Sequence, residues 1–149
     1  MTAPPEINAT MVKFGYPETL VKEYSKWMVQ VRAAQVTLGS LVLVCKDPAT
    51  AFSRISAEAF RELETVIGEV EASLSKLWSY QKINYLMLMM VDKDVHFHVI
   101  PRYDAERVFE GVRFADAGWP RAPELTKPKL LEGEMLEKLV SFLRINWPE

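Results

Sequence analysis

The sequence predicts an α+β fold in which one antiparallel sheet packs against a long helix and a C-terminal helix. Strand-like segments follow one another in close pairs without a helix between them, which favours an antiparallel sheet over a doubly wound one. Residues 56–79 have the periodicity of one long helix. No glycine-rich phosphate loop is found. At 149 residues, the chain has the size of one domain. We expect a loose arm over residues 1–16 and a single domain over residues 17–149.

Five segments have the apolar patterns of strands: residues 26–33, 39–46, 82–91, 94–102 and, in a shorter form, 107–116. Residues 26–33 alternate between apolar and polar side chains, which predicts a half-buried strand. Residues 39–46 are apolar on both faces, which predicts a central strand. Because Pro101 has no amide hydrogen, pairing should weaken there or one edge of that strand should be free.

The clearest helix is predicted over residues 56–79, where apolar side chains recur at spacings of three and four. Ser56 can cap it, and Glu58 suits its first turn. A last helix is predicted over residues 133–146, and a short one over residues 16–25 with a proline in its first turn. The proline- and glycine-containing segment 117–129 is predicted as a surface loop.

Composition narrows the classes of protein to consider. The net charge is −2 without a basic run, so there is no general nucleic-acid signal. Cys45 is the only cysteine and lies in an apolar run, which favours a buried thiol in a reducing compartment. The first residues do not resemble a signal peptide, and the longest apolar run is too short to span a bilayer. We expect a soluble cytoplasmic protein without a membrane partner.

The two histidines of the chain, His96 and His98, lie two residues apart in the segment DKDVHFHVIPRY. In a strand, Asp94, His96 and His98 share one face, whereas the apolar side chains between them share the other. Arg102 is in phase with this row if the strand continues past the proline. The pattern predicts an open polar face opposite a core face.

Three functions could use such a row. Metal binding is disfavoured, because positions 94 and 98 are roughly 13 Å apart along a strand, whereas zinc ligands lie about 2 Å from the ion. An elongated anion such as a phosphate chain fits better, since neutral imidazole can attack phosphorus and imidazolium can donate to its oxygens. A proton switch or plain surface polarity would explain the residue types but not their phase. No metal or other cofactor is expected.

The segment DVHFHVIPR resembles the motif of the histidine triad family, in which three histidines alternate with apolar residues. His96 and His98 match its second and third histidines, and the apolar positions also match. The strand KINYLMLMMV, the segment VTLGSLVLVCKD and the helix over residues 56–79 are similar to the corresponding parts of the family. The resemblance covers most of residues 20–145, but only residues 84–102 are specific.

This resemblance implies a five-stranded antiparallel sheet, commonly in a homodimer, and a nucleotidyl hydrolase or transferase. The substrate would be a nucleoside phosphate ester, anhydride or phosphoramidate, such as a dinucleoside polyphosphate. By position, His96 would be the nucleophile and His98 would contact phosphate oxygens. The resemblance and the strand phase together give three candidate substrate-binding residues: Asn84, Ser40 and Arg102.

Asp94 occupies the place of the first histidine in the motif. Its charge would repel a phosphate by about 1 to 4 kcal/mol at about 4 Å. This favours a catalytically inactive nucleotide-binding or regulatory protein, and a structural protein without a ligand is a third alternative. In the opposite interpretation, a carboxylate beside a histidine fixes its tautomer and stabilises developing positive charge. We therefore hypothesise that Asp94 orients His96.

Overall fold

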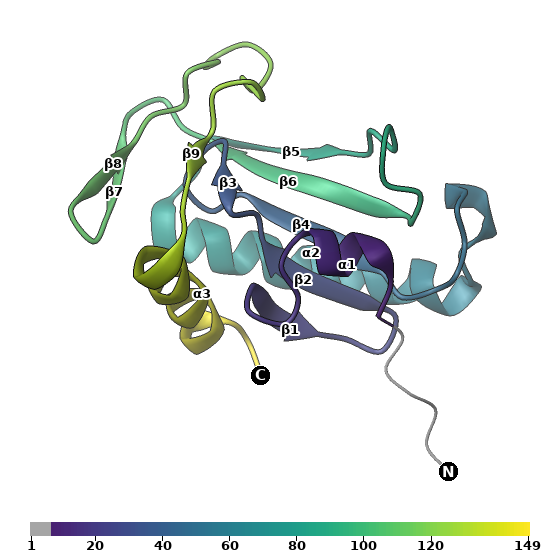
Figure 1. The fold of residues 1–149 in the computed structure, drawn as a ribbon. Coiled ribbons are helices and arrows are strands. Elements are labelled where there is room, and N and C mark those ends of the chain that lie inside the picture. The colour runs from purple at the N-terminus through teal and green to yellow at the C-terminus, as the bar shows by residue number, and fades with distance from the viewer. Residues whose placement is uncertain (1–6) are drawn as a thin grey trace.

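A computed structural model of the chain describes residues 7–149 and confirms the α+β fold. Five strands form one antiparallel sheet in the order β1-β2-β4-β6-β5 (Figure 1). They are β1 (Leu20–Glu23), β2 (Trp27–Val31), β4 (Leu41–Cys45), β5 (Lys82–Leu86) and β6 (His96–Arg102). The segment expected to be a short helix over residues 16–25 instead contains β1, which supplies the fifth strand of the sheet.

Strand β4 is central, as its apolar character on both faces predicts, and every one of its residues is buried. It pairs with β6 from His96 to Val99 and not beyond. Pro101 therefore lies where β6 has only β5 as a partner, in agreement with the expected free edge. The long strand predicted over residues 82–91 ends at Leu86, and residues 87–95 form an irregular loop that leads into β6.

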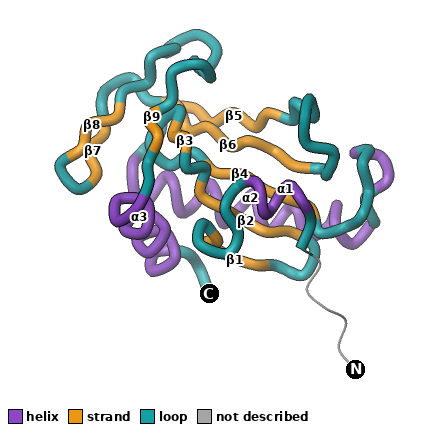
Figure 2. The backbone as a smooth tube through the Cα atoms, in the orientation of Figure 1, coloured by secondary structure: helices purple, strands orange, loops and turns teal. Residues whose placement is uncertain are grey.

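Two helices cover one face of the sheet and build the main core with it. Helix α2 (Ala57–Trp78) begins at Ser56, whose side chain accepts a hydrogen bond from the amide of Ala59, as expected of the cap. Helix α3 (Gly133–Asn146) matches the predicted last helix. Both bury apolar side chains against the sheet, among them Val70 and Leu143. Figure 2 shows α2 running behind the strands.

The remaining elements are short. A 3-10 helix, η1 (Phe52–Arg54), precedes α2. Strands β3 (Ala34–Gln35) and β9 (Lys129–Leu130) pair with each other, and β7 (Arg107–Phe109) and β8 (Val112–Phe114) form a hairpin. The segment predicted as one short strand over residues 107–116 is therefore a separate two-stranded sheet. Among residues 7–149, no helix has the length and apolar character needed to cross a bilayer.

The second face of the sheet is covered by helix α1 (Ala9–Lys13), which lies in front of β2 and β4 in Figure 1. Met11 of this helix packs on Met28, Val42 and Val44 and is fully buried. Strand β2 is consequently buried along its whole length instead of half-buried. Within the arm expected over residues 1–16, the structure describes helix α1 and its cap, and residues 1–6 lie outside the described part. Asn8 caps α1 by accepting from the amide of Met11.

Candidate functional site

His96 and His98 lie on the face of β6 that helix α1 covers. In the sheet register, His96 pairs with Val44 and His98 with Val42, two of the residues on which Met11 packs. The two imidazole rings are 5.2 Å apart between centroids and nearly perpendicular. The ring of Phe14, which follows α1, lies 6.1 Å from the ring of His96 and 5.6 Å from that of His98. The helix and the histidine row thus form one site.

The backbone carbonyl of Asp94 fixes the tautomer of His96. His96 Nδ1 lies 2.7 Å from this oxygen. A carbonyl oxygen can only accept a hydrogen bond, so Nδ1 must carry the proton. In the neutral ring, Nε2 then has the free electron pair. His96 is only 2% exposed, and it is one of the residues that line a pocket beside α1.

The Asp94 carboxylate is directed at helix α1 rather than at His96. Its Oδ2 accepts a hydrogen bond of 2.8 Å from the hydroxyl of Thr10 and one of 3.3 Å from the Thr10 amide. The hypothesis assigned the orienting of His96 to the Asp94 carboxylate, but in the structure this carboxylate bonds to Thr10, and the contact with His96 comes from the main-chain carbonyl of Asp94. This arrangement directs the carboxylate toward the Thr10 donors.

Helix α1 has only five residues, and polar contacts at both ends hold it on the sheet. At its start, the Asn8 amide donates to the carbonyl of Cys45 over 3.0 Å. At its end, the buried Gln30 donates to the carbonyl of Met11, and Thr19 donates to that of Phe14. Because so short a helix is marginal alone, these contacts determine where Phe14 lies.

A pocket of about 220 Å³ opens beside the two histidines. Its walls come from α1, from the end of β2 and from the loop after β5, through Lys13, Phe14, Arg32, Leu88, Met89, Met90, Val91, Asp92, His96 and His98. Lys13 forms an ion pair of 2.8 Å with Asp92. The pocket therefore combines an apolar wall with two basic side chains and one carboxylate, in addition to the histidines.

His98 is held in its neutral form. Burial, followed by the positive charge of Arg32, lowers the pKa of His98 to about 4. Its Nδ1 is buried without a hydrogen-bond partner among the described residues. At neutral pH, the ring can offer either one donor or one acceptor to a ligand.

This shift predicts a pH-dependent contribution of His98 to folding. Between its ordinary pKa of 6.5 and about 4, the unfolded chain binds a proton that the folded chain does not bind. The contribution of neutral His98 to the free energy of unfolding is complete above pH 6.5 and is lost as the pH falls through about 4. We expect His98→Gln to lose less stability on acidification than the wild type. Urea unfolding at about pH 7 and about pH 4.5 measures this, and an identical loss in both proteins would contradict it.

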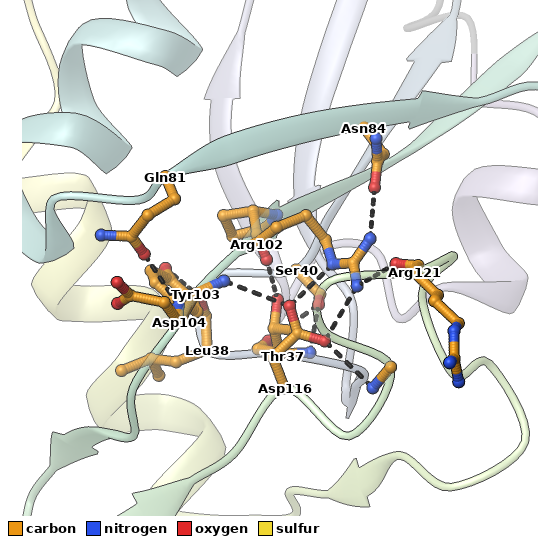
Figure 3. Close-up of polar contacts among 12 residues, drawn as sticks. Thr37, Leu38, Ser40, Gln81, Asn84, Arg102, Tyr103, Asp104, Asp116 and Arg121 are labelled. Carbon is orange, nitrogen blue, oxygen red and sulfur yellow. Dashed lines mark hydrogen bonds and ion pairs between the residues drawn. The ribbon is translucent and has the colours of Figure 1, made fainter.

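The three predicted substrate-binding residues, Asn84, Ser40 and Arg102, do not line this pocket. Arg102 is 4% exposed, and its guanidinium forms a two-pronged ion pair with Asp116 at 2.7 and 3.1 Å. It also donates to the side-chain oxygen of Asn84 and to the carbonyl of Arg121, as Figure 3 shows. The structure thus gives Arg102 and Asn84 another role: they tie the loop around Asp116 to the end of β6.

Ser40 is completely buried in the turn before β4. Its hydroxyl donates to the carbonyl of Thr37 and accepts from the Thr37 amide (Figure 3). Both bonds close the turn, and Ser40 does not line the pocket beside the histidines. Ser40 was predicted to bind substrate only because of its position in the family resemblance. Such a position does not indicate which hydrogen bonds a side chain makes.

The sequence interpretation missed the residues that close the pocket. Lys13 and Phe14 fell within the expected loose arm, although Asn8 ahead of an apolar helical run is a readable cap signal. Arg32 lies near the end of the strand expected over residues 26–33 and was not among the predicted site residues, yet it is half-buried and lines the pocket together with His98. Across residues 7–149, no group of three or more His, Cys, Asp or Glu side chains is arranged to hold a metal ion.

Several solved structures have the same arrangement of elements. A histidine triad protein from Sinorhizobium meliloti matches with a TM-score of 0.72 and 17% identity, over 94% of this chain and 95% of that one. A histidine triad protein from Bradyrhizobium japonicum matches with a TM-score of 0.69 and 18% identity, over 94% of this chain and 96% of that one. A hypothetical histidine triad nucleotide-binding protein from Sulfolobus tokodaii matches with a TM-score of 0.64 and 19% identity, over 92% of this chain and 88% of that one.

No protein-family model and no curated protein matches the sequence. The likeness to the three solved structures extends over nearly the whole of each chain at low sequence identity, and what it establishes is the architecture. Together with the strand order and the pair of histidines on β6, it confirms the predicted resemblance at the level of fold: the chain has the histidine triad fold.

Proposed function

We propose that the protein binds a nucleotide and transfers its nucleotidyl group to water or to another acceptor through His96. The observation that carries this proposal is the short contact between His96 Nδ1 and the Asp94 carbonyl, which leaves Nε2 as the free nucleophile. A nucleophile fixed in one tautomer, next to a neutral second histidine and two basic side chains, suits an attack on phosphorus.

The reaction would proceed in two displacements. Nε2 of His96 attacks the α-phosphorus, an N–P bond forms, and the bond from phosphorus to the leaving group breaks. The leaving group takes the electron pair and a proton from solvent. Water then attacks phosphorus, the N–P bond breaks, and its electron pair returns to Nε2. The water proton goes to solvent, and a nucleoside monophosphate is released.

The walls of the pocket support separate roles for its two sides. The apolar side chains of Phe14, Leu88 and Met89 suit the base of a nucleotide, because an aromatic ring and flexible apolar chains pack against a flat π-system. In this proposal, His98 contacts an oxygen of the transferring phosphoryl group. In this proposal, Asp94 is a positioning residue that acts through its carbonyl on His96 and through its carboxylate on α1.

Trapping a covalent intermediate tests the proposal. We expect incubation with dinucleoside polyphosphates or nucleoside phosphoramidates to release nucleoside monophosphate. Rapid acid-free denaturation and mass spectrometry should place a nucleotidyl adduct on His96, because a phosphoramidate bond survives at neutral and alkaline pH. Turnover without any adduct at His96, and unchanged in His96 variants, would contradict the proposed nucleophile.

The alternative, a nucleotide-binding or regulatory protein without turnover, predicts a different result. Nucleotides would then raise the melting temperature while no substrate of the panel is consumed. The occupation of the first motif position by Asp94 is the feature that favours this alternative. The homodimer implied by the resemblance is also part of the proposal, and analytical ultracentrifugation of the purified chain would test it.

A further inference from the structure

Arg32 is the least expected charged group in the pocket. It follows the last residue of β2, and its amide donates to the carbonyl of Ser40 over 3.0 Å, so the extended backbone continues for one more residue. Side chains alternate along an extended chain, so Arg32 lies on the same face as Gln30. Gln30 is in register with Val42, which is in register with His98. Arg32 therefore reaches the pocket next to His98, on the side away from His96.

The polar contacts of Arg32 leave much of its guanidinium unused. One terminal nitrogen donates to the carbonyl of Ala34 over 2.6 Å. Nε is buried and has no hydrogen-bond partner in the described part of the chain. No carboxylate of residues 7–149 forms an ion pair with Arg32, whereas Lys13 on the opposite wall is paired with Asp92.

Such an environment is unfavourable for a cation without a ligand. Burial lowers the pKa of the Arg32 guanidinium, although an arginine keeps its charge at neutral pH. The same charge helps to hold His98 neutral. A half-buried cation that has no carboxylate partner is compensated if an anionic group of the ligand comes between Arg32 and the pocket opening.

We infer that Arg32 forms a second anion subsite, beside His98 and away from His96, which selects ligands that carry a second phosphoryl group. This inference rests on the proposed function, since it takes the histidine pocket as a phosphate site, and it narrows the substrate class. Polyphosphate compounds would use both His98 and Arg32. Nucleotidyl esters or phosphoramidates with a single phosphoryl group would leave Arg32 unused.

Binding of matched probes tests the subsite. Isothermal titration calorimetry compares AMP with ADP, and phosphate with pyrophosphate, on the wild type, Arg32→Gln, Arg32→Lys and Arg61→Gln. Arg61 is an exposed residue of α2, which covers the other face of the sheet, so its variant is a control with the same change of charge. Melting curves establish that each variant is folded, and Arg32→Gln should melt no lower than the wild type, because it removes an uncompensated charge.

We expect the wild type to bind ADP more tightly than AMP, and pyrophosphate more tightly than phosphate. Arg32→Gln should lower the affinity for ADP and for pyrophosphate by about tenfold to a hundredfold and leave the affinity for AMP and for phosphate unchanged. Arg32→Lys should recover part of this loss, and Arg61→Gln should match the wild type. Equal effects of Arg32→Gln on AMP and ADP, or no effect on either, would overturn the subsite.

The two proposals can fail separately. If AMP and ADP do not bind but pyrophosphate binds in a manner that depends on Arg32, the anion subsite stands and the nucleotide site does not. If both nucleotides bind with affinities that do not depend on Arg32, the nucleotide site stands and the subsite does not. If no probe binds the wild type, both are overturned.

Discussion

Replacement of His96 with asparagine is expected to lower kcat/KM for the best substrate of the panel by about a thousandfold or more. Asparagine can accept or donate hydrogen bonds at this position but has no ring nitrogen that can form the N–P bond. The loss should appear in kcat, because the pocket walls that bind the ligand remain in place. Single-turnover kinetics with the purified variant measures it, and the covalent adduct should also be absent.

Asp94→Asn is the matched control for this experiment. It retains the backbone carbonyl that accepts from His96 Nδ1 and an oxygen that can accept from Thr10. The change removes the charge and replaces the second carboxylate oxygen by an NH2 group, while the contact with His96 is kept, so we expect activity within about tenfold of the wild type. A loss as large as that of His96→Asn would show that the carboxylate charge takes part in the chemistry, against the role as an anchor of α1.

The largest expected effect on stability comes from Asp116, far from the histidines in the sequence. Its side chain is 1% exposed and that of Arg102 is 5% exposed. Asp116→Ala leaves the buried guanidinium without its ion-pair partner and removes the acceptor of the Tyr103 amide. Loss of one partner from a buried pair costs about 3 to 5 kcal/mol of unfolding free energy, measured by urea denaturation.

Two further variants separate the charge effect from a general disturbance. Lys138→Ala removes the exposed ion pairs with Glu134 and Glu110 and should change the unfolding free energy by less than about 0.5 kcal/mol. The double variant Arg102→Met, Asp116→Leu removes both charges together and should recover part of the loss seen in Asp116→Ala. A double variant that is less stable than Asp116→Ala would exclude the uncompensated charge as the cause.

The elements with strong local signals could be predicted from the sequence. Helix α2 has a cap at Ser56 and a long apolar stripe, and both features are local. Strand β6 could be predicted from the alternation of polar and apolar residues around His96 and His98. Because Pro101 has no amide hydrogen, the end of the pairing between β6 and β4 before this residue could also be predicted. These features depend on residues a few positions apart, so the sequence was sufficient.

The closure of the site could not be predicted in the same way, because it depends on contacts between distant segments. Helix α1 is too short to form from its own propensity and is held by Asp94, Gln30 and Cys45. Arg102 is in phase with the histidines as expected, but its charge is used by Asp116, fourteen positions later. The sequence could predict on which face of the sheet a side chain lies, but it could not predict which residue forms an ion pair with each charged side chain.

The anchor between Thr10 and Asp94 also has a consequence for the order in which the molecule assembles. The two residues are 84 positions apart in the chain. Closing so long a loop has an entropic cost that is offset only once the intervening strands are paired. The sheet and α2 can therefore form before α1 docks, and a chain with a complete main core would still lack one wall of its pocket. We therefore expect the pocket to be completed only when α1 docks on the finished sheet.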